Sequence, residues 1–404
     1  MRRFSRFFSF AAVCTAALLA ACGGGGSDSG SSGGGGSGAT GILKVGLTDA
    51  AACGYDEVNV TVGRVRVHQS ATAGQSDSGW QELVVSPARQ VDLLSLNNGV
   101  VDELGQVSVP TGRYNQLQLV LLVNGNSAPW VNAVTPTATG VEAPLATPAA
   151  SQSGLRIPAS IDIVENQIAD YVIDFDACKS VVRLGATGPY NLKPVLSLVQ
   201  RVNSAGMRVV GYVATALPAD TTKVSVQSAG AEVKSTPPDS TGRFTLYPVP
   251  AGTYDLVVSA VGRVPAVVTG VVVTNTAETL VNATGDRIDP PASGTNRTIA
   301  GTVSTGTTPI DAMIEIIKKY TGGPNVVVAT APVNGTTGAF AYTVNSGAPV
   351  RAAFSPTTAP LVFSPDLSPP TGRYTVDAIA GGSRKSLDVD VTTGDATNLS
   401  FTFP

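Results

Sequence analysis

Residues 241–260 read TGRFTLYPVPAGTYDLVVSA and predict two strands, each introduced by a turn. Gly242 is placed to form the first turn, after which apolar and polar residues alternate as in a half-buried strand. Pro250 and Gly252 predict the second turn, and Tyr254 opens a second alternating run. Two packed sheets would bury such alternating faces, so this segment predicts a β-sandwich. The residues expected to point inward are Phe244, Leu246, Leu256, Val258 and Ala260.

The same pattern occurs again further along the chain, which indicates an internal repeat. We expect residues 206–288 and 297–404 to be two copies of one antiparallel β-sandwich, with an insertion at 345–368 in the second copy. The insertion is rich in Pro, Ser and Ala, which predicts a long surface excursion. The matching segments are 208–213 with 298–303, 241–244 with 337–340, and 250–254 with 370–374.

One part of the second copy gives conflicting signals. Apolar residues between 310 and 317 fit helical spacing, and Asp311 stands near a possible helix start. The equivalent residues 223–227 of the first copy alternate like a strand. Following the repeat, we predict a strand over 312–320 and a hairpin over 321–325.

The composition of the whole chain supports an all-β protein. Only 14% of its 404 residues are charged, which is low, and short apolar runs are separated by turn-forming residues. The length allows two or three domains. Removal of residues 1–21, which hold three arginines and no acids, would change the net charge from −3 to −6. Such a mildly acidic chain lacks the basic surface of a nucleic-acid-binding protein.

Residues 41–203 precede the repeats and predict a separate β-rich domain. A polar loop is expected over 70–79, and one helix is expected over 98–104, where apolar residues share one side. The predicted strands include 42–48, 58–68, 80–85, 168–176 and 192–199.

A third Pro-x-Gly-x-Tyr sequence stands at residues 110–114. In a regular strand, Tyr114 would share a face with Gln116, whereas Leu117 and Leu119 would lie on the other face. A β-bulge would bring the tyrosine onto the leucine face. Otherwise the motif is a coincidence in this part of the chain.

The chain begins with the features of an exported protein. A basic start is followed by an apolar run over 7–19 that is too short to span a membrane. Residues 18–22, LLAAC, resemble the lipobox of bacterial lipoproteins, in which the cysteine is acylated and becomes the mature N-terminus. The resemblance implies a signal peptide over 1–21 and lipidation of Cys22. Because Gly23 follows where Asp would favour inner-membrane retention, it also implies an outer-membrane lipoprotein, on the periplasmic or surface face. The alternative is an ordinary secretory signal with an incidental cysteine.

This interpretation predicts roles for the segment after Cys22 and for two further cysteines. Residues 22–40 are almost all Gly and Ser and predict a flexible tether with a reach of roughly 25 Å. Cys53 and Cys178 remain as a pair in an oxidising compartment, and we predict a disulfide between them. It would close a loop of about 125 residues and contribute ~4–5 kcal/mol through loop-closure entropy. The alternative is two separate buried thiols.

Two family resemblances are carried by short motifs. Together, seven segments of the first domain resemble bacterial domain-of-unknown-function family 4382, which implies a front domain of exported lipoproteins with no established activity. The two repeats resemble the carboxypeptidase-regulatory-like, transthyretin-like β-sandwich, through a glycine-led strand, a turn-Gly-Phe strand and a Pro-x-Gly-x-Tyr strand. The seven segments are 41–45, 47–50, 55–58, 91–94, 174–177, 179–182 and 192–195.

Few residues suggest chemistry. His68 is the only histidine, and with no nucleophile elbow or HExxH helix we interpret it as a polar residue at a strand end. Asp174 and Asp176 are two apart in a predicted strand, so both carboxylates would point to one face. They could serve as glycosidase acid and base or as Ca²⁺ ligands. Alternatively, they form a solvated face or pair with Lys179 or Arg183.

Two larger sets complete the candidates. A set of one lysine, one asparagine and one acid could form an isopeptide crosslink if the three side chains converged in a domain core. The lysine of such crosslinks usually lies in the first strand of its domain, and this lysine does not. Four aromatic residues could form a sugar-stacking platform, or they could be core and edge residues. The first set is Lys223, Glu278 and Asn282, and the second is Trp80, Trp130, Tyr212 and Tyr247.

The sequence therefore predicts a lipid-anchored protein of three β-rich domains with no catalytic or cofactor-binding residues. We expect a non-catalytic binding, adhesion or scaffolding role in the cell envelope, with a glycan or an envelope or surface protein as partner. The alternatives are a carbohydrate-binding module array and a hydrolase that uses Asp174 and Asp176.

Overall fold

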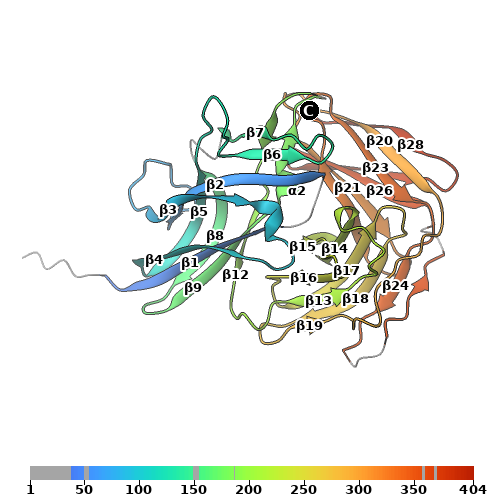
Figure 1. Ribbon diagram of the computed structural model, residues 1–404, viewed down its shortest axis with the longest axis horizontal. Coiled ribbons are helices and arrows are strands. Elements are labelled where there is room, and N and C mark those ends of the chain that lie inside the picture. Colours follow the sequence, from blue (N-terminus) through green and yellow to red (C-terminus); the bar gives the residue numbers. More distant parts are fainter. Residues whose placement is uncertain (1–37, 50–53, 149–153, 186, 357–359, 368–370) are drawn as a thin grey trace, which may run out of the picture. The chain divides into compact units, whose positions relative to one another are not determined.

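The computed structural model describes residues 38–404 except 50–53, 149–153, 186, 357–359 and 368–370. Residues 39–404 form one unit. Within that unit we distinguish module one (39–203), module two (206–288) and module three (297–404). Each module is a pair of packed β-sheets, which confirms the all-β fold (Figure 1).

Module one begins with a four-stranded sheet in the order β12-β9-β1-β4. β1 pairs in parallel with β9 and antiparallel with β4. Its apolar residues alternate, so Leu43, Val45 and Leu47 are buried in the core. The strands are β1 (Thr40–Asp49), β4 (Asp102–Pro110), β9 (Ile168–Phe175) and β12 (Leu196–Gln200).

The second sheet of module one runs β10-β11-β7-β6-β2-β5-β8, and β3 also pairs with β2. Its apolar face packs on the first sheet. The strands are β2 (Tyr55–His68), β3 (Gln81–Asp92), β5 (Gly112–Leu121), β6 (Ala133–Pro136), β7 (Ala143–Ala146), β8 (Leu155–Ile163), β10 (Val181–Arg183) and β11 (Tyr190–Leu192).

Modules two and three share one strand order, as the sequence repeat predicts. The small sheets are β16-β13-β19 and β23-β20-β28, and the large sheets begin β15-β14-β17-β18 and β22-β21-β26-β27. The module-two strands are β13 (Val209–Tyr212), β14 (Thr222–Ser228), β15 (Ala231–Thr236), β16 (Arg243–Leu246), β17 (Gly252–Ala260), β18 (Ala266–Val273) and β19 (Thr279–Leu280). The module-three strands are β20 (Asn296–Ser304), β21 (Ala312–Lys319), β22 (Asn325–Pro332), β23 (Ala339–Asn345), β26 (Arg373–Ala380), β27 (Ser383–Asp390) and β28 (Ala396–Thr402).

The tyrosine of the Pro-x-Gly-x-Tyr motif has a common structural role. Tyr114 Oη donates a hydrogen bond to the Pro110 carbonyl at 3.0 Å, and Tyr254 Oη does so to the Pro250 carbonyl at 2.9 Å. A β-bulge follows each of these tyrosines. The bulge moves Tyr114 into the core beside the leucines, so the motif in module one is not a coincidence.

The insertion of module three is more than a surface excursion, because part of it extends the large sheet of module two. We call residues 345–368 the strap. Its β24 (Val350–Ala353) pairs in parallel with β18, and β25 (Ser364–Pro365) pairs with β24. Val350 and Ala352 are buried as a result.

The helix predicted over 98–104 is wrong. Asn98 and Gly99 have φ values of 53° and 77°, which a right-handed helix does not allow, and β4 already begins at Asp102. The helical turn lies earlier, at η1 (Leu93–Leu96), because the Asp92 side chain accepts the Leu94 N–H. The other short helices are α2 (Ala177–Ser180) and η2 (Ala219–Thr221).

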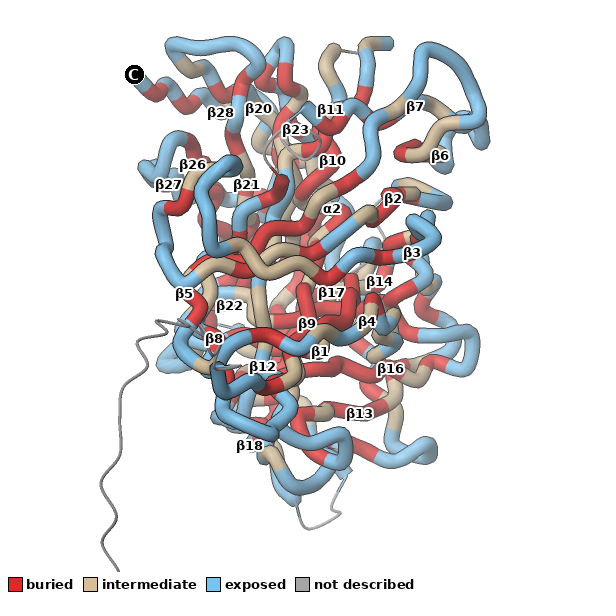
Figure 2. The backbone as a smooth tube through the Cα atoms, turned by 90° about the vertical axis from the view of Figure 1, so that its left-hand side faces the viewer, coloured by how far each residue is buried: buried red, intermediate tan, exposed pale blue. Residues whose placement is uncertain are grey.

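The predicted strand over 312–320 is confirmed as β21, whose alternating face packs in the module-three core. Figure 2 shows that buried segments follow the strands and that loops are mainly exposed. The residues described form no helix with the length and hydropathy needed to span a membrane.

Candidate functional site

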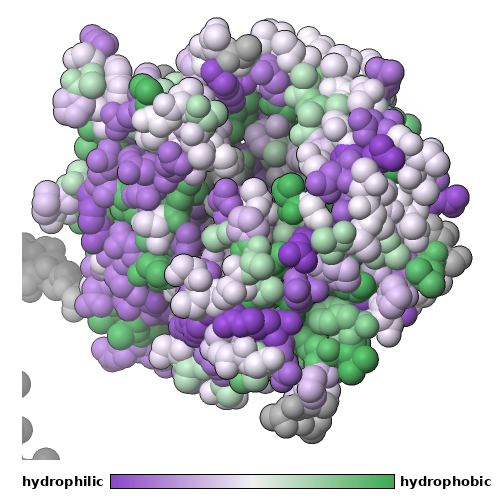
Figure 3. Space-filling view, turned by 45° about the vertical axis from the view of Figure 1, so that its right-hand side comes forward, coloured by the Kyte–Doolittle hydropathy of each residue, from purple (hydrophilic) through white to green (hydrophobic). Residues whose placement is uncertain are grey.

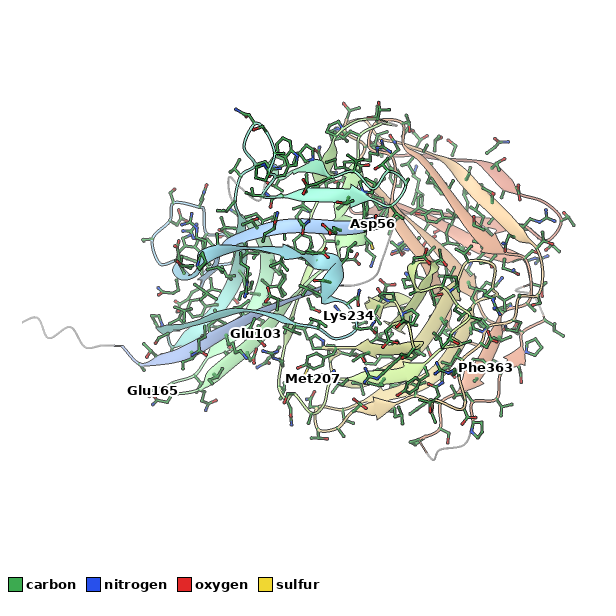
Figure 4. The ribbon with its side chains drawn as sticks, viewed as in Figure 1. Asp56, Glu103, Glu165, Met207, Lys234 and Phe363 are labelled. Carbon is green, nitrogen blue, oxygen red and sulfur yellow. The ribbon has the colours of Figure 1, made fainter. Side chains whose placement is uncertain are left out.

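Modules one and two meet at a buried junction. The side chain of Lys234, on β15, is only 3% exposed. Its Nζ lies 2.6 Å from Asp174 Oδ1 and 2.8 Å from the Asp49 carbonyl oxygen, so module two is bonded to β9 and β1 of module one. Figure 4 shows Lys234 where these two modules meet.

A second set of ion pairs continues from this contact. Glu232, two residues before Lys234, accepts hydrogen bonds from Lys179 of module one and Lys223 of module two, both at 2.7 Å. Lys179 Nζ also lies 2.7 Å from Asp176 Oδ2. Asp176 caps α2 by accepting the Lys179 N–H. We call six residues the junction cluster: the acids Asp174, Asp176 and Glu232 and the lysines Lys179, Lys223 and Lys234.

The junction cluster balances its charges internally. Burial alone would raise the pKa of Glu232, but the ammonium groups of Lys223 and Lys179 outweigh burial and hold this pKa well below its ordinary value. Burial lowers the pKa of Lys179, but Glu232 and Asp176 reverse this effect and raise it. At Asp174, burial outweighs the opposing effect of Lys234, so the pKa of this carboxyl is raised above its ordinary value. The ion pairs of the cluster fix the position of module two against module one.

This geometry changes the interpretation of Asp174 and Asp176. They do not lie on one strand, because β9 ends at Phe175 and Asp176 is the N-cap of α2. Each carboxylate has a lysine within 2.7 Å, and for Asp176 this is Lys179, as the alternative interpretation expected. A Ca²⁺ ion would have to displace these ammonium groups. Within the described part of the chain, no three His, Cys, Asp or Glu side chains are placed to share a metal ion.

A cleft of about 660 Å³ opens beside the junction cluster and is lined by all three modules. Lys179 and Val195 belong to module one, and residues 229–232 form the turn into β15 of module two. The opposite wall is the outward face of β21, β26 and β27 of module three. On the face drawn in Figure 3, polar and apolar residues are intermixed.

The module-three wall carries charged and hydroxyl side chains. Arg384 Nη1 lies 2.8 Å from Glu315 Oε2 and also contacts Asp377 Oδ2. Further along the wall, Asp388 Oδ1 accepts a hydrogen bond from Lys319 Nζ at 3.0 Å. Thr375 also donates to Asp388. These side chains could bind a polar or charged ligand by hydrogen bonds.

His68 has a structural role, as expected. It is the last residue of β2, its Nδ1 accepts the Ser70 N–H at 2.9 Å, and its Nε2 lies 3.0 Å from the Ser78 carbonyl oxygen. Its ring lies 5.0 Å from that of Trp80. His68 therefore holds the loop that follows β2.

The other candidate sets are not brought together. Lys223 is bonded to Glu232. The Asn282 side-chain oxygen accepts the Tyr212 N–H, and its Nδ2 donates to the Tyr212 carbonyl, so no isopeptide set forms. Tyr247 is buried under Arg208, and none of the ring pairs among the described residues joins two of the four candidate aromatics. The geometry therefore supplies no sugar-stacking platform in this part of the chain.

Cys22 and Cys53 lie outside the described residues, so lipidation of Cys22 and the pairing of Cys53 with Cys178 remain predictions. Cys178 lies in α2. Its neighbour Ala177 donates its N–H to Asp49 Oδ1 at 2.8 Å, four residues before Cys53. That contact joins the start of α2 to the end of β1.

Sequence reasoning missed Glu232, Lys234 and Arg384. Glu232 and Lys234 are charged residues two apart on β15, in a chain with few charges. That spacing was the available signal. Their partners in module one could not be identified, because they lie 53 and 60 residues away in sequence.

Comparison with known proteins and protein families finds one match, to a protein family. No curated protein matches the chain. Residues 40–194, less than half of the chain, match the family described as "Domain of unknown function (DUF4382)". The match covers the strands of module one from β1 to β11, as the sequence motifs predict. Module one is therefore the part of this protein that is similar to a DUF4382 domain.

Proposed function

We propose that this protein is a lipid-anchored, non-catalytic binding protein of the bacterial cell envelope. The observation that carries the proposal is the 660 Å³ cleft, which side chains from all three modules line together. Large concave sites between packed domains are common places for ligands. The ion pairs of the junction cluster hold the module-one and module-two walls of the cleft together.

The charge arrangement supports binding over catalysis. Hydrolysis by two carboxylates needs both groups to flank the bond that is cleaved and to contact the substrate. In the junction cluster each carboxylate instead has an ammonium partner. A scaffolding or adhesion role would use the same rigid junction.

The proposed anchor rests on the LLAAC sequence at 18–22 and the Gly/Ser tether that follows. Acylation at several positions on one residue would hold the protein stably at a membrane. Labelling cells with a fatty-acid analogue should mark the full-length protein, and Cys22→Ser should remove the label. A labelled Cys22→Ser protein would contradict lipidation at this residue.

The binding proposal can be tested by thermal unfolding of residues 39–404, which contain every described strand. The protein is scanned against a panel of envelope polysaccharides and peptides, with calcium held constant. A ligand at a hundred times its Kd should stabilise the protein by about 2.7 kcal/mol. No shift with any ligand would argue against a binding role.

A matched pair of variants tests whether the stabilising ligand binds in the cleft. Ser386 and Ser383 are both exposed on β27, but only Ser386 lines the cleft. Ser386→Trp should abolish the ligand-induced shift, and Ser383→Trp should leave it unchanged. Equal behaviour of the two variants would place the ligand outside the cleft.

A further inference from the structure

The charges along the cleft do not all cancel. The junction cluster is neutral, and Lys319 pairs with Asp388. The remaining charged group consists of Glu315, Asp377 and Arg384, in which one guanidinium faces two carboxylates. The cleft therefore carries an excess negative charge at one defined place.

The two carboxylates are direct neighbours. Glu315 on β21 stands opposite Asp377 on the antiparallel strand β26. Like charges in this arrangement are destabilising unless a cation lies between them. Arg384 Nη1 serves both, with Glu315 Oε2 at 2.8 Å and Asp377 Oδ2 also in contact.

Asp377 is not fully satisfied by this arrangement. The residue is 4% exposed, and its Oδ1 has no hydrogen-bond partner. A buried carboxylate oxygen without a donor is costly, so such an atom in a cleft indicates a missing partner. Asp377 lines the cleft, where a ligand could supply the donor.

The surroundings favour a donor on an aliphatic chain. Met313 and Ile317 flank Glu315 on the outward face of β21, two residues away on each side, and both line the cleft. Each is half-buried. Methylene groups could pack on these side chains while a charged nitrogen reaches the carboxylates.

We propose that the cleft binds the primary ammonium group of an aliphatic amine at Glu315 and Asp377. The proposal rests on the binding function proposed above and names its ligand class. The amine could belong to a free polyamine or to a lysine side chain of a peptide, since both offer an ammonium group on a flexible methylene chain.

Titration calorimetry on residues 39–404 tests this site. The probes are 1,5-diaminopentane, spermidine and a lysine-containing tripeptide, and 1,5-pentanediol is the uncharged control. We expect the amines to bind, the diol not to bind, and added salt to weaken binding. If the polyamines bind more tightly than the peptide, the ligand is a free polyamine. If the peptide binds more tightly, the ligand is a lysine side chain.

Variants separate binding from stability. Asp377→Asn and Glu315→Gln should weaken amine binding about tenfold or more, because a charge-assisted hydrogen bond is lost. Asp289→Asn, which removes an ion pair with Arg263 outside the cleft, should not change it. Without ligand, Asp377→Asn should unfold at the same temperature as the wild type or higher, whereas a purely structural role would lower it.

Three results would overturn the proposal. The first is equal binding of amines by wild type and Asp377→Asn. The second is Ca²⁺ binding that depends on Asp377 with no amine binding, which would make this a metal site. The third is no amine binding while another ligand gives a shift that Ser386→Trp abolishes, in which case the binding function would stand. If no ligand of any class binds, the binding function fails as well.

Discussion

Modules two and three have the same strand order but surround a buried lysine in different ways. Lys234 of module two pairs with the Asp174 carboxylate at 2.6 Å. Lys318 of module three, also buried, donates to the Arg373 carbonyl at 3.0 Å and lies 3.9 Å from the centre of the Tyr374 ring. Burial lowers the pKa of Lys318 to about 7, because nearby Asp366 and Asp390 only partly oppose it. The repeat thus determines topology, whereas the neighbouring groups determine whether a buried lysine has an acidic partner.

Replacement of Lys234 should have the largest effect. Lys234→Met would leave the Asp174 carboxylate buried without its ammonium partner, which we expect to cost ~3–5 kcal/mol in the free energy of unfolding. Urea unfolding of residues 39–404 at pH 7.5 measures this. A loss below ~1 kcal/mol would mean that the junction does not depend on the pair.

Lys318 should make stability depend on pH. Its folded pKa of about 7 lies below its value in the unfolded chain, so the unfolded state binds more protons between these two values. Stability should therefore rise by about 2 kcal/mol between pH 7 and 9. Lys318→Met should remove this rise, and a variant with an unchanged pH profile would show that another group titrates.

The motif tyrosines should contribute equally in the two modules, although their acceptors differ. Tyr254 bonds to the Pro250 carbonyl, whereas Tyr374 bonds to the Asn345 carbonyl at the start of the strap. Tyr254→Phe and Tyr374→Phe should each cost about 1 kcal/mol. A much larger loss for Tyr374→Phe would show that the strap position depends on this one bond.

The smallest effect is expected at the cleft surface. The Lys319 and Asp388 side chains are 52% and 76% exposed, so water and salt screen their attraction. Lys319→Ala should change the free energy of unfolding by less than ~0.5 kcal/mol. A loss comparable to that of Lys234→Met would remove the distinction between buried and exposed pairs.

Local sequence predicted the strands and turns that depend on local signals. The alternation around Tyr254 and its repeat gave the sandwich and the strand at β21. The same reasoning failed at 98–104, because the positive φ angles of Asn98 and Gly99 override apolar spacing. Short-range pattern was sufficient only where no unusual backbone geometry intervened.

Contacts between distant segments could not be predicted. The parallel pairing of β24 with β18 depends on how modules two and three pack, which no motif in the strap indicates. Likewise, Asp174 was identified as a candidate, but Lys234 is 60 residues away along the chain. The sequence identified four of the six residues of the junction cluster as candidates and missed Glu232 and Lys234.

The central claim is that Asp174 and Lys234 are coupled across the boundary between modules one and two. A double-mutant cycle with Asp174→Asn, Lys234→Met and the combined variant measures that coupling by urea unfolding. We predict a coupling energy of about 2 kcal/mol, because the combined variant leaves no unpaired buried charge. Additivity within ~0.5 kcal/mol would contradict the account.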